Sequence, residues 1–224
     1  MLNLAQTPVG LSHGEALMRQ ASRVYTTSTG PIYLRERCPA TFVGQLRPDE
    51  GLHAFARTPE REHELLLKIA SSAKSELALA YTGAGAIVGQ ITLAEAGSWW
   101  QEAGVCREVA IEISAGWRKL GVARSLIELV GAREDLEDWI LLAMGFSWHW
   151  ETEQLGLHSA RYRELLARLL APYGFVEYLT NEPNLRDDPT NILLARIGKH
   201  VEQIALNQFY ACLLRSEGSP GMGA

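Results

Sequence analysis

Hydrophobic and polar positions along the chain follow two periods, one typical of strands and one typical of helices. Apolar residues recur at every second position, or in short unbroken runs, in the segments that we expect to be strands. These segments are 32–35, 77–81, 86–94, 108–114, 139–144, 175–179 and 191–197. The segments that we expect to be helices are 48–56, 59–73, 122–130, 159–171 and 199–215. Helices interspersed among strands in this order predict a mixed α/β sheet.

The two ends of the chain lack these periods. Residues 1–29 are rich in Ser, Thr and Gly, and residues 217–224 combine Gly with Ser and Pro. We expect both ends to be flexible. Between them we expect one α/β domain over residues 30–198 and a C-terminal helix over residues 199–216. That helix could pack back on the sheet or form a dimer or partner interface, because it carries several apolar residues.

Composition narrows the classes of partner. The chain has 224 residues and is 47% hydrophobic, which allows a sizeable core. Its formal net charge is -5 and no block of Lys and Arg is present, so we do not expect nucleic-acid binding. No apolar run approaches the roughly 18 residues that span a bilayer, and the N-terminus lacks a secretory signal pattern. We therefore expect a cytoplasmic protein that does not enter a membrane.

The cysteines and histidines predict neither a disulfide framework nor a metal site. Cys38, Cys106 and Cys212 form no CxxC pair, and an odd number fits a reducing compartment. The six histidines show neither an HExxH motif nor paired-ligand spacing.

The turn from Arg118 to Ala123 is the most informative stretch of the sequence. It follows the expected strand 108–114 and begins the expected helix 122–130. A turn of this kind points backbone N–H groups outward, and the helix adds about half a positive charge at its N-terminus. Small residues at positions 121 and 123 let a phosphate approach the backbone closely. The sequence therefore predicts an anion site suited to a pyrophosphate.

The turn pattern, Arg/Gln-x-x-Gly-x-Gly/Ala after a strand, resembles the acetyl-CoA pyrophosphate loop of the GNAT superfamily of N-acetyltransferases. With the following strand and a helix that ends in Tyr173-Gly174-Phe175, the resemblance covers roughly residues 75–198. It implies a GNAT-type fold, in which helices flank a mixed, mostly antiparallel twisted sheet, here with an additional C-terminal helix. It also implies acetyl-CoA as the cosubstrate.

Three further segments resemble the acetoin-utilization protein acetyltransferase family AcuA. They are Asp135 to Ile140, Trp148-His149-Trp150 and Asp188 to Lys199. That family pairs an Ile-Glu-Val strand with a pyrophosphate loop and carries a Trp-His-Trp segment. The resemblance implies transfer of an acetyl group from acetyl-CoA to a lysine of acetyl-CoA synthetase, which inactivates that enzyme.

Glu112 is the candidate general base. Alternation along the strand 108–114 places Glu108 and Glu112 on the face opposite to the apolar side chains. A partly desolvated carboxylate in mid-strand, with no basic residue adjacent, should have a raised pKa suited to taking a proton from an amine. Its position also matches the glutamate of the family's Ile-Glu-Val segment. Glu108 is the alternative base, and an exposed strand glutamate without a catalytic role is the alternative interpretation.

The other candidate site residues would contact acetyl-CoA. We expect an N–H group near Ile113 and Ser114 to stabilise the negative charge that develops on the thioester oxygen. We expect the pyrophosphate to bind mainly backbone N–H groups, with a charge-assisted bond from Arg118 or Arg124. The residues concerned are Arg118, Lys119, Leu120, Gly121, Val122, Ala123 and Arg124. The alternative is an ordinary basic start of a helix.

The general acid is not identified by the sequence. Many GNAT members carry a tyrosine five residues before the phenylalanine of the Gly-Phe pair, and Leu170 stands at that position here. Water could protonate the departing thiolate, and Tyr162 and Tyr173 are weaker candidates.

The leading hypothesis is a protein lysine acetyltransferase that transfers directly from acetyl-CoA, with Glu112 as the base. Acetylation of a small amine is one alternative, and a non-catalytic acyl-CoA sensor, motivated by Leu170, is another. The role of Trp148-His149-Trp150 stays open between an acceptor channel, a proton relay through His149 and simple aromatic packing.

Overall fold

The structure is a computed structural model that describes residues 13–52, 55–56, 58–150, 152 and 156–216. A nine-stranded sheet forms its centre, with the strand order β1-β2-β4-β5-β6-β7-β9-β8 and with β3 beside β5. The strands are β1 (Arg23–Thr27), β2 (Gly30–Arg35), β3 (Arg47–Pro48), β4 (Glu76–Thr82), β5 (Ala86–Glu95), β6 (Cys106–Ile113), β7 (Ile140–Gly145), β8 (Val176–Tyr178) and β9 (Ile192–Ile197). The α-helices of the described part are α1 (His13–Met18), α2 (Ala40–Val43), α3 (Pro59–Ser71), α4 (Val122–Gly131), α6 (Ser159–Leu170), α7 (Pro183–Arg186) and α8 (Gln203–Leu214).

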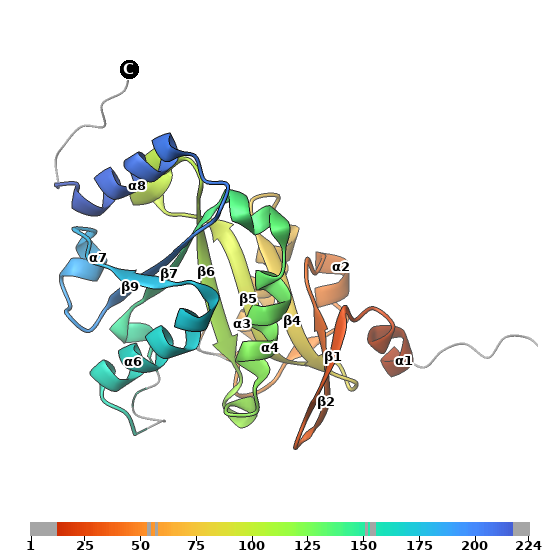
Figure 1. The fold of residues 1–224 in the computed structure, drawn as a ribbon. Coiled ribbons are helices and arrows are strands. Elements are labelled where there is room, and N and C mark those ends of the chain that lie inside the picture. Colours follow the sequence, from red (N-terminus) through yellow and green to blue (C-terminus); the bar gives the residue numbers. More distant parts are fainter. Residues whose placement is uncertain (1–12, 53–54, 57, 151, 153–155, 217–224) are drawn as a thin grey trace, which may run out of the picture.

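Strand pairing confirms the predicted fold class. Within the described residues, β6 is parallel to β7 and β3 is parallel to β5, whereas every other strand pair is antiparallel. Helices cover both faces of the sheet (Figure 1). This is the mixed, mostly antiparallel sheet flanked by helices that the sequence predicts.

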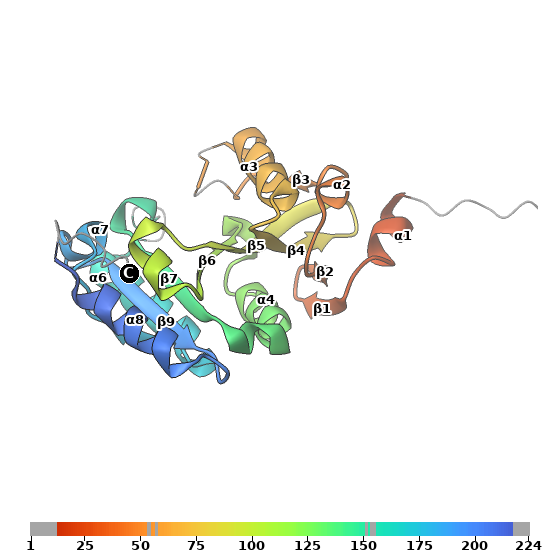
Figure 2. The same cartoon turned by 90° about the horizontal axis from the view of Figure 1, so that it is seen from above.

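The helices divide between the two faces. α3 and α4 lie on opposite sides of the sheet (Figure 2). Apolar residues of α4 and of the end of α6 share one buried cluster, to which alternate residues of β6 contribute. α8 packs on residues of β7 and β9 that alternate with those of that cluster, so it covers the other face. On β6 the apolar residues facing α4 are Val109, Ile111 and Ile113, as the alternation predicts.

β6 and β7 diverge part of the way along their length. Their pairing ends at Glu108 opposite Leu142, although β6 continues to Ile113 and β7 to Gly145. Beyond that point β5 still pairs with β6, and β9 still pairs with β7. Each strand is therefore held on its outer side, and their inner edges face each other across a wedge (Figure 1).

Most predicted elements are present. Each predicted strand is found with ends within two residues of the expected bounds. The expected helices over 59–73, 122–130, 159–171 and 199–215 correspond to α3, α4, α6 and α8. Prediction and structure agree in these segments because their hydrophobic period is clear, and that period decides both the type of element and which side chains are buried.

The expected helix over 48–56 is wrong in its described part. Pro48 belongs to β3, and the N–H of Asp49 donates to the carbonyl oxygen of Ile87 at 2.9 Å. The carboxylate of Asp49 accepts from the N–H of Gly51 at 3.2 Å and forms a turn. Backbone groups that would hydrogen-bond within a helix are therefore bonded to β5 instead. Residues 53 and 54 lie outside the described residues.

The N-terminal segment 1–29 differs from the expected flexible segment in its described part. It contains α1 and β1, and β1 pairs with β2 from Arg23 opposite Leu34 onward. Leu17 of α1 is fully buried, and its carbonyl oxygen accepts from the Tyr81 hydroxyl at 2.9 Å. β1 has no hydrophobic period of its own, and it is a strand because it pairs with the edge of β2. The predicted tail, 217–224, lies outside the described residues.

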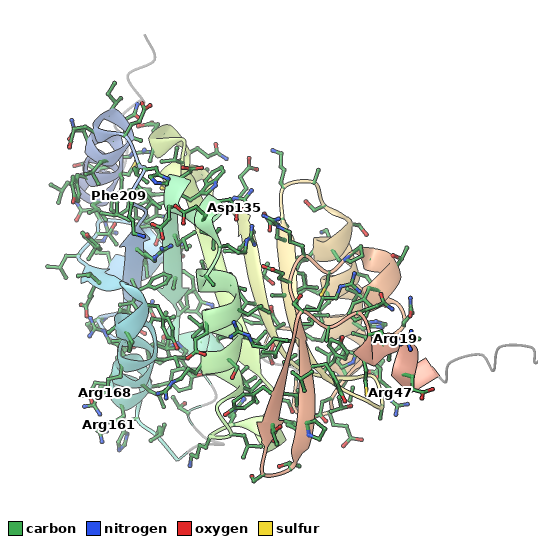
Figure 3. All side chains as sticks on the ribbon, turned by 45° about the vertical axis from the view of Figure 1, so that its right-hand side comes forward. Arg19, Arg47, Asp135, Arg161, Arg168 and Phe209 are labelled. Atoms are coloured by element: carbon green, nitrogen blue, oxygen red, sulfur yellow. The ribbon has the colours of Figure 1, made fainter. Side chains whose placement is uncertain are left out.

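The C-terminal helix packs back on the sheet. Its buried side chains are Phe209, Cys212 and Leu213, and the position of Phe209 on α8 is labelled in Figure 3. Ile204 and Leu214 remain exposed on the outer side. The three cysteines of the chain are buried free thiols. Within the described residues, no helix has the length and the apolar character needed to cross a membrane.

We predict that Gly198→Ala destabilises the fold. A Cβ at position 198 would overlap the backbone of Glu137, so β9 or the segment before β7 would have to move. The expected loss is about 2 kcal/mol of unfolding free energy, measured by urea denaturation. The matched control is Gly97→Ala, where a Cβ meets nothing within 4 Å and φ is -55°. Equal stability of the two variants would contradict the close approach.

Candidate functional site

A cleft of about 940 Å³ opens where β6 and β7 diverge. Its walls come from β6, β7, α6 and the start of α4, and most of its lining side chains are apolar. α6 directs Leu166, Leu169 and Leu170 to the cleft, while Arg161 and Arg168 lie on its outer side (Figure 3). The cleft has the size and the apolar character of a site for a cofactor-sized ligand.

Glu112, the residue that the sequence analysis takes as the candidate base, lines this cleft. The residue is buried, with 5% of its surface exposed, and it pairs across the sheet with Gln90 of β5. It lies on the face of β6 opposite to the α4 cluster. Glu108 also lines the cleft, and burial raises the pKa of its carboxyl. The strand therefore carries two carboxyl groups into an otherwise apolar wall.

Glu62 of α3 is a functional candidate that the sequence analysis missed. It is fully buried, and the pKa of its carboxyl is raised to about 7. Burial is the largest cause and the negative charge of Glu112 the second, while a hydrogen bond from the backbone of Ala56 acts in the opposite direction. The two carboxyl groups are thus close enough to influence each other. The signal available in the sequence is spacing, because Glu62 precedes Leu66 by four residues in the expected helix and so shares its face; the structure shows that both are buried.

The loop before α4 has the backbone geometry expected of an anion site. Lys119 has φ of 61° and Gly121 has φ of 82°, so two residues in three adopt the left-handed conformation. α4 begins at Val122, and the N–H of Ser125 is bonded to the carbonyl of Gly121 at 3.0 Å. The N–H groups of the first turn, at residues 122–124, have no carbonyl in the preceding turn to bond. Residues 121–124 all line the cleft.

Tyr25 of β1 closes one side of this loop. A Cβ at position 121 would overlap the Tyr25 hydroxyl, so a larger residue there would displace the end of the tyrosine side chain. The positive φ of Gly121 gives a second, independent reason for glycine. No sequence signal pointed to Tyr25, because β1 lacks a recognisable hydrophobic period.

The other predicted acetyl-CoA contacts separate into two groups. Ile113, Arg118 and Lys119 line the cleft, whereas Ser114 and Leu120 do not. The Ser114 N–H donates to the carbonyl of Val88 at 2.9 Å, and its hydroxyl donates to Asp49. The side chain of Leu120 packs against the core. Ser114 therefore joins the loop to β5 and the 49–51 turn.

Arg118 fixes the end of β6 to the loop. Its Nε donates to the carbonyl oxygen of Ile113 at 3.1 Å. Just before β6 begins, the carbonyl oxygen of Val105 accepts from the N–H of Ile140 of β7 at 2.8 Å. Odd-numbered residues of β6 therefore direct their backbone groups toward β7. Since the pairing ends at Glu108, the N–H groups of Ile111 and Ile113 face the cleft.

The residues considered for the general acid lie apart. Leu170 is 4% exposed and lines the cleft with its apolar side chain. Tyr162 also lines the cleft and stacks on Trp150, with ring centroids 5.2 Å apart. Tyr173 is outside the cleft lining and donates to Glu128 at 3.4 Å, and burial followed by the Glu128 charge raises its pKa. Of the two tyrosines considered, only Tyr162 reaches the cleft.

The Trp148-His149-Trp150 segment packs against neighbouring aromatic rings and also lines the cleft. Trp150 is buried against Tyr162, which is a packing role. His149 lines the cleft, and its ring lies 5.8 Å from that of Phe55. Trp148 is 59% exposed and stacks on Phe146. Within the described residues, no group of three or more His, Cys, Asp and Glu side chains could hold a metal ion.

Comparison with known proteins gives consistent matches. The chain is 28% identical over 188 residues to the acetoin utilization protein AcuA of Bacillus subtilis (strain 168), covering 82% of this chain and 89% of that protein. The AcuA protein of Bacillus licheniformis is 26% identical over the same shares. The crystal structure of an acetoin utilization protein from Exiguobacterium sibiricum 255-15 superposes with a TM-score of 0.81 and 30% identity, covering 86% of this chain and 93% of that one. No family model matches the chain.

We predict that Glu62 makes the stability of the protein depend on pH. Its folded-state pKa of about 7 lies above the ordinary 4.5, so between these values the folded state holds a proton that the unfolded state has lost. Stability must therefore fall as pH rises through this window. Glu62→Gln removes that fall, and its stability relative to the wild type should improve by on the order of 3 kcal/mol between pH 4 and pH 8.

Urea unfolding at several pH values measures this difference. Glu64→Gln, an exposed position on the same helix, is the matched control and should leave the pH dependence unchanged. Parallel stability curves for Glu62→Gln and the wild type would contradict the raised pKa.

Proposed function

This chain belongs to the acetoin utilization protein AcuA family of GNAT N-acetyltransferases, and we propose that it acetylates a lysine side chain of a partner protein, using acetyl-CoA. One observation carries the proposal. A single strand-loop-helix unit, β6 to α4, brings a buried carboxylate and an anion-binding loop into one apolar cleft. Transfer from acetyl-CoA to an amine would use the carboxylate as a proton acceptor and the loop to bind the pyrophosphate.

Successive parts of the cleft match successive parts of acetyl-CoA, from the pyrophosphate to the thioester. The pyrophosphate would bind the N–H groups at the start of α4, with Lys119 and Arg124 adding positive charge. The pantetheine arm would run back along the inner edge of β6, past the backbone groups of Ile113 and Ile111. Apolar side chains of α6 would cover it. This order places the thioester near the point where β6 and β7 meet.

Acetyl-CoA supplies an activated thioester, whose carbon–sulfur bond breaks as a carbon–nitrogen bond forms to the acceptor amine. Glu112 accepts a proton from the lysine ammonium, which leaves the nitrogen lone pair free to attack. The N–H of Ile111 or Ile113 faces the cleft and would donate to the thioester oxygen as it becomes negative. The second nitrogen proton passes to solvent, and water protonates the thiolate of coenzyme A. Leu170 has no proton to give at this position.

The acceptor is proposed to be acetyl-CoA synthetase. The support is the family's likeness in the Asp135, Trp148 and Asp188 segments, together with relatives named for acetoin utilization. The cleft favours a cationic acceptor, because the carboxyl groups of Glu108 and Glu112 both line it and attract an ammonium group.

A non-catalytic acyl-CoA sensor is the second candidate. The observation that favours it is Leu170, which puts a buried leucine where many GNAT members carry a tyrosine acid. A sensor needs the loop and the cleft but has no use for the carboxylate of Glu112. The two functions therefore differ in what Glu112→Gln does.

We predict that Glu112→Gln slows acetyl transfer about 10²–10⁴-fold, because it removes the proton acceptor. The measurement is the intact mass of acetyl-CoA synthetase after incubation with acetyl-CoA and either protein. Glu95→Gln, which lies on β5 and pairs with Lys74 away from the cleft, is the control. A mass gain that survives Glu112→Gln contradicts the role of Glu112. No gain with either protein, despite binding of acetyl-CoA, favours the sensor.

We predict that Gly121→Ala weakens acetyl-CoA binding at least tenfold. The new Cβ would strain a residue with φ of 82° and push the loop away from Tyr25, which disturbs the N–H groups of the first turn. Isothermal titration calorimetry measures the affinity. Gly116→Ala is the control, since a Cβ there meets nothing within 4 Å. Unchanged affinity in Gly121→Ala would show that the loop does not hold the cofactor.

A further inference from the structure

A second, smaller cavity of about 140 Å³ lies beyond the point where β6 and β7 meet. It is on the face covered by α4 and α6, and residues of the main buried cluster form its walls. The buried lining residues are Ile91, Leu93, Ile127, Val130, Leu136, Leu141, Leu170 and Phe175. The cavity is therefore a mainly apolar pocket at the edge of this buried cluster, and it is partly open to solvent.

This cavity continues from the cleft. Val109, Ile111, Ala143 and Leu170 line both spaces. Val109 and Ala143 directly follow Glu108 and Leu142, the last residues that pair between β6 and β7. A chain that enters along β6 from the loop at 118–121 thus reaches the small cavity after passing the thioester position.

Arg196 is the charged side chain at the cavity, and its charge is paired. Its Nη2 forms an ion pair with Glu137, while its Nη1 is buried without a hydrogen-bond partner among the described residues; Tyr173 donates to Glu128. The charge of Arg196 is therefore compensated before any ligand arrives. An uncharged alkyl chain suits such walls, whereas a carboxylate would lose its hydration without gaining a free cation.

The size of the cavity sets the length of chain that it accepts. An apolar protein cavity of about 150 Å³ is known to hold a molecule as large as benzene. A space of about 140 Å³ is correspondingly larger than an acetyl methyl group requires. It has room for the two further methylene groups of a butyryl chain.

We propose that this cavity is an acyl-chain subsite, and that the protein binds propionyl-CoA and butyryl-CoA as donors besides acetyl-CoA. The inference rests on the proposed function, because it takes the cleft as the site of the coenzyme A part. It also gives Leu170 a role. The side chain that replaces the usual tyrosine forms the apolar wall shared by the thioester position and the acyl chain.

The first experiment measures the binding of coenzyme A, acetyl-CoA, butyryl-CoA and succinyl-CoA to the full chain by calorimetry, without an acceptor. Burial of two more methylene groups should make butyryl-CoA bind about tenfold more tightly than acetyl-CoA. Succinyl-CoA, of similar length but charged, should bind more weakly than butyryl-CoA. Equal or weaker binding of butyryl-CoA relative to acetyl-CoA overturns the proposal, and so does a preference for succinyl-CoA. No binding of any of the four overturns instead the proposed function.

Substitutions of Val130 locate the effect in the cavity. Val130 lies on α4, lines the small cavity and does not line the cleft. Val130→Phe fills the space and should abolish the tenfold preference for butyryl-CoA over acetyl-CoA. Val130→Ala widens it and should shift the preference toward hexanoyl-CoA, which keeps the test open if the larger side chain impairs folding. A preference that neither variant changes places the acyl chain elsewhere and overturns the assignment.

Discussion

The end of the pairing between β6 and β7 is the constraint on which the rest of the site depends. Two parallel strands that stay paired leave no room between them, but here the ladder stops at Glu108 and Leu142. β5 and β9 hold the outer edges, so the divergence does not unravel the sheet. The unpaired backbone of β6 must then find partners in a ligand or in water. A strand edge that would be a liability on an exposed sheet becomes a binding surface inside a covered wedge.

Two buried carboxyl groups are the second feature of the site, and their burial is energetically unfavourable. Glu62 and Glu112 lie on different elements, and each makes ionisation of the other less favourable. Apolar clusters on both faces of the sheet hold α3 and β6 in place, and this packing offsets the unfavourable burial of the two carboxyl groups. Burial and the charge of Glu112 together raise the pKa of Glu62 to about 7.

The N-terminal strand, β1, contributes directly to the candidate site. β1 has little apolar character, yet its Tyr25 reaches the loop that precedes α4 and lies close to Gly121. Arg118 and Ser114 connect the same loop to β6, β5 and the turn at Asp49. The backbone N–H groups of the first turn of α4 are thus fixed from several sides before a ligand binds, which reduces the entropy lost on binding.

The sequence alone determined the elements whose hydrophobic period is clear, the order of strands and helices, and the placement of Glu112 and the 118–124 turn at one strand-loop-helix unit. These are local properties, because spacing of two or of three to four residues fixes which side chains share a face. Only the tertiary structure decided the features that join distant segments. They include β3 in place of a helix at 48–56, Tyr25 against Gly121, Glu62 beside Glu112, and the cavity behind Leu170. In each case the partner lies far away in the chain, and pairing, burial or repulsion exists only once the sheet has brought the two together.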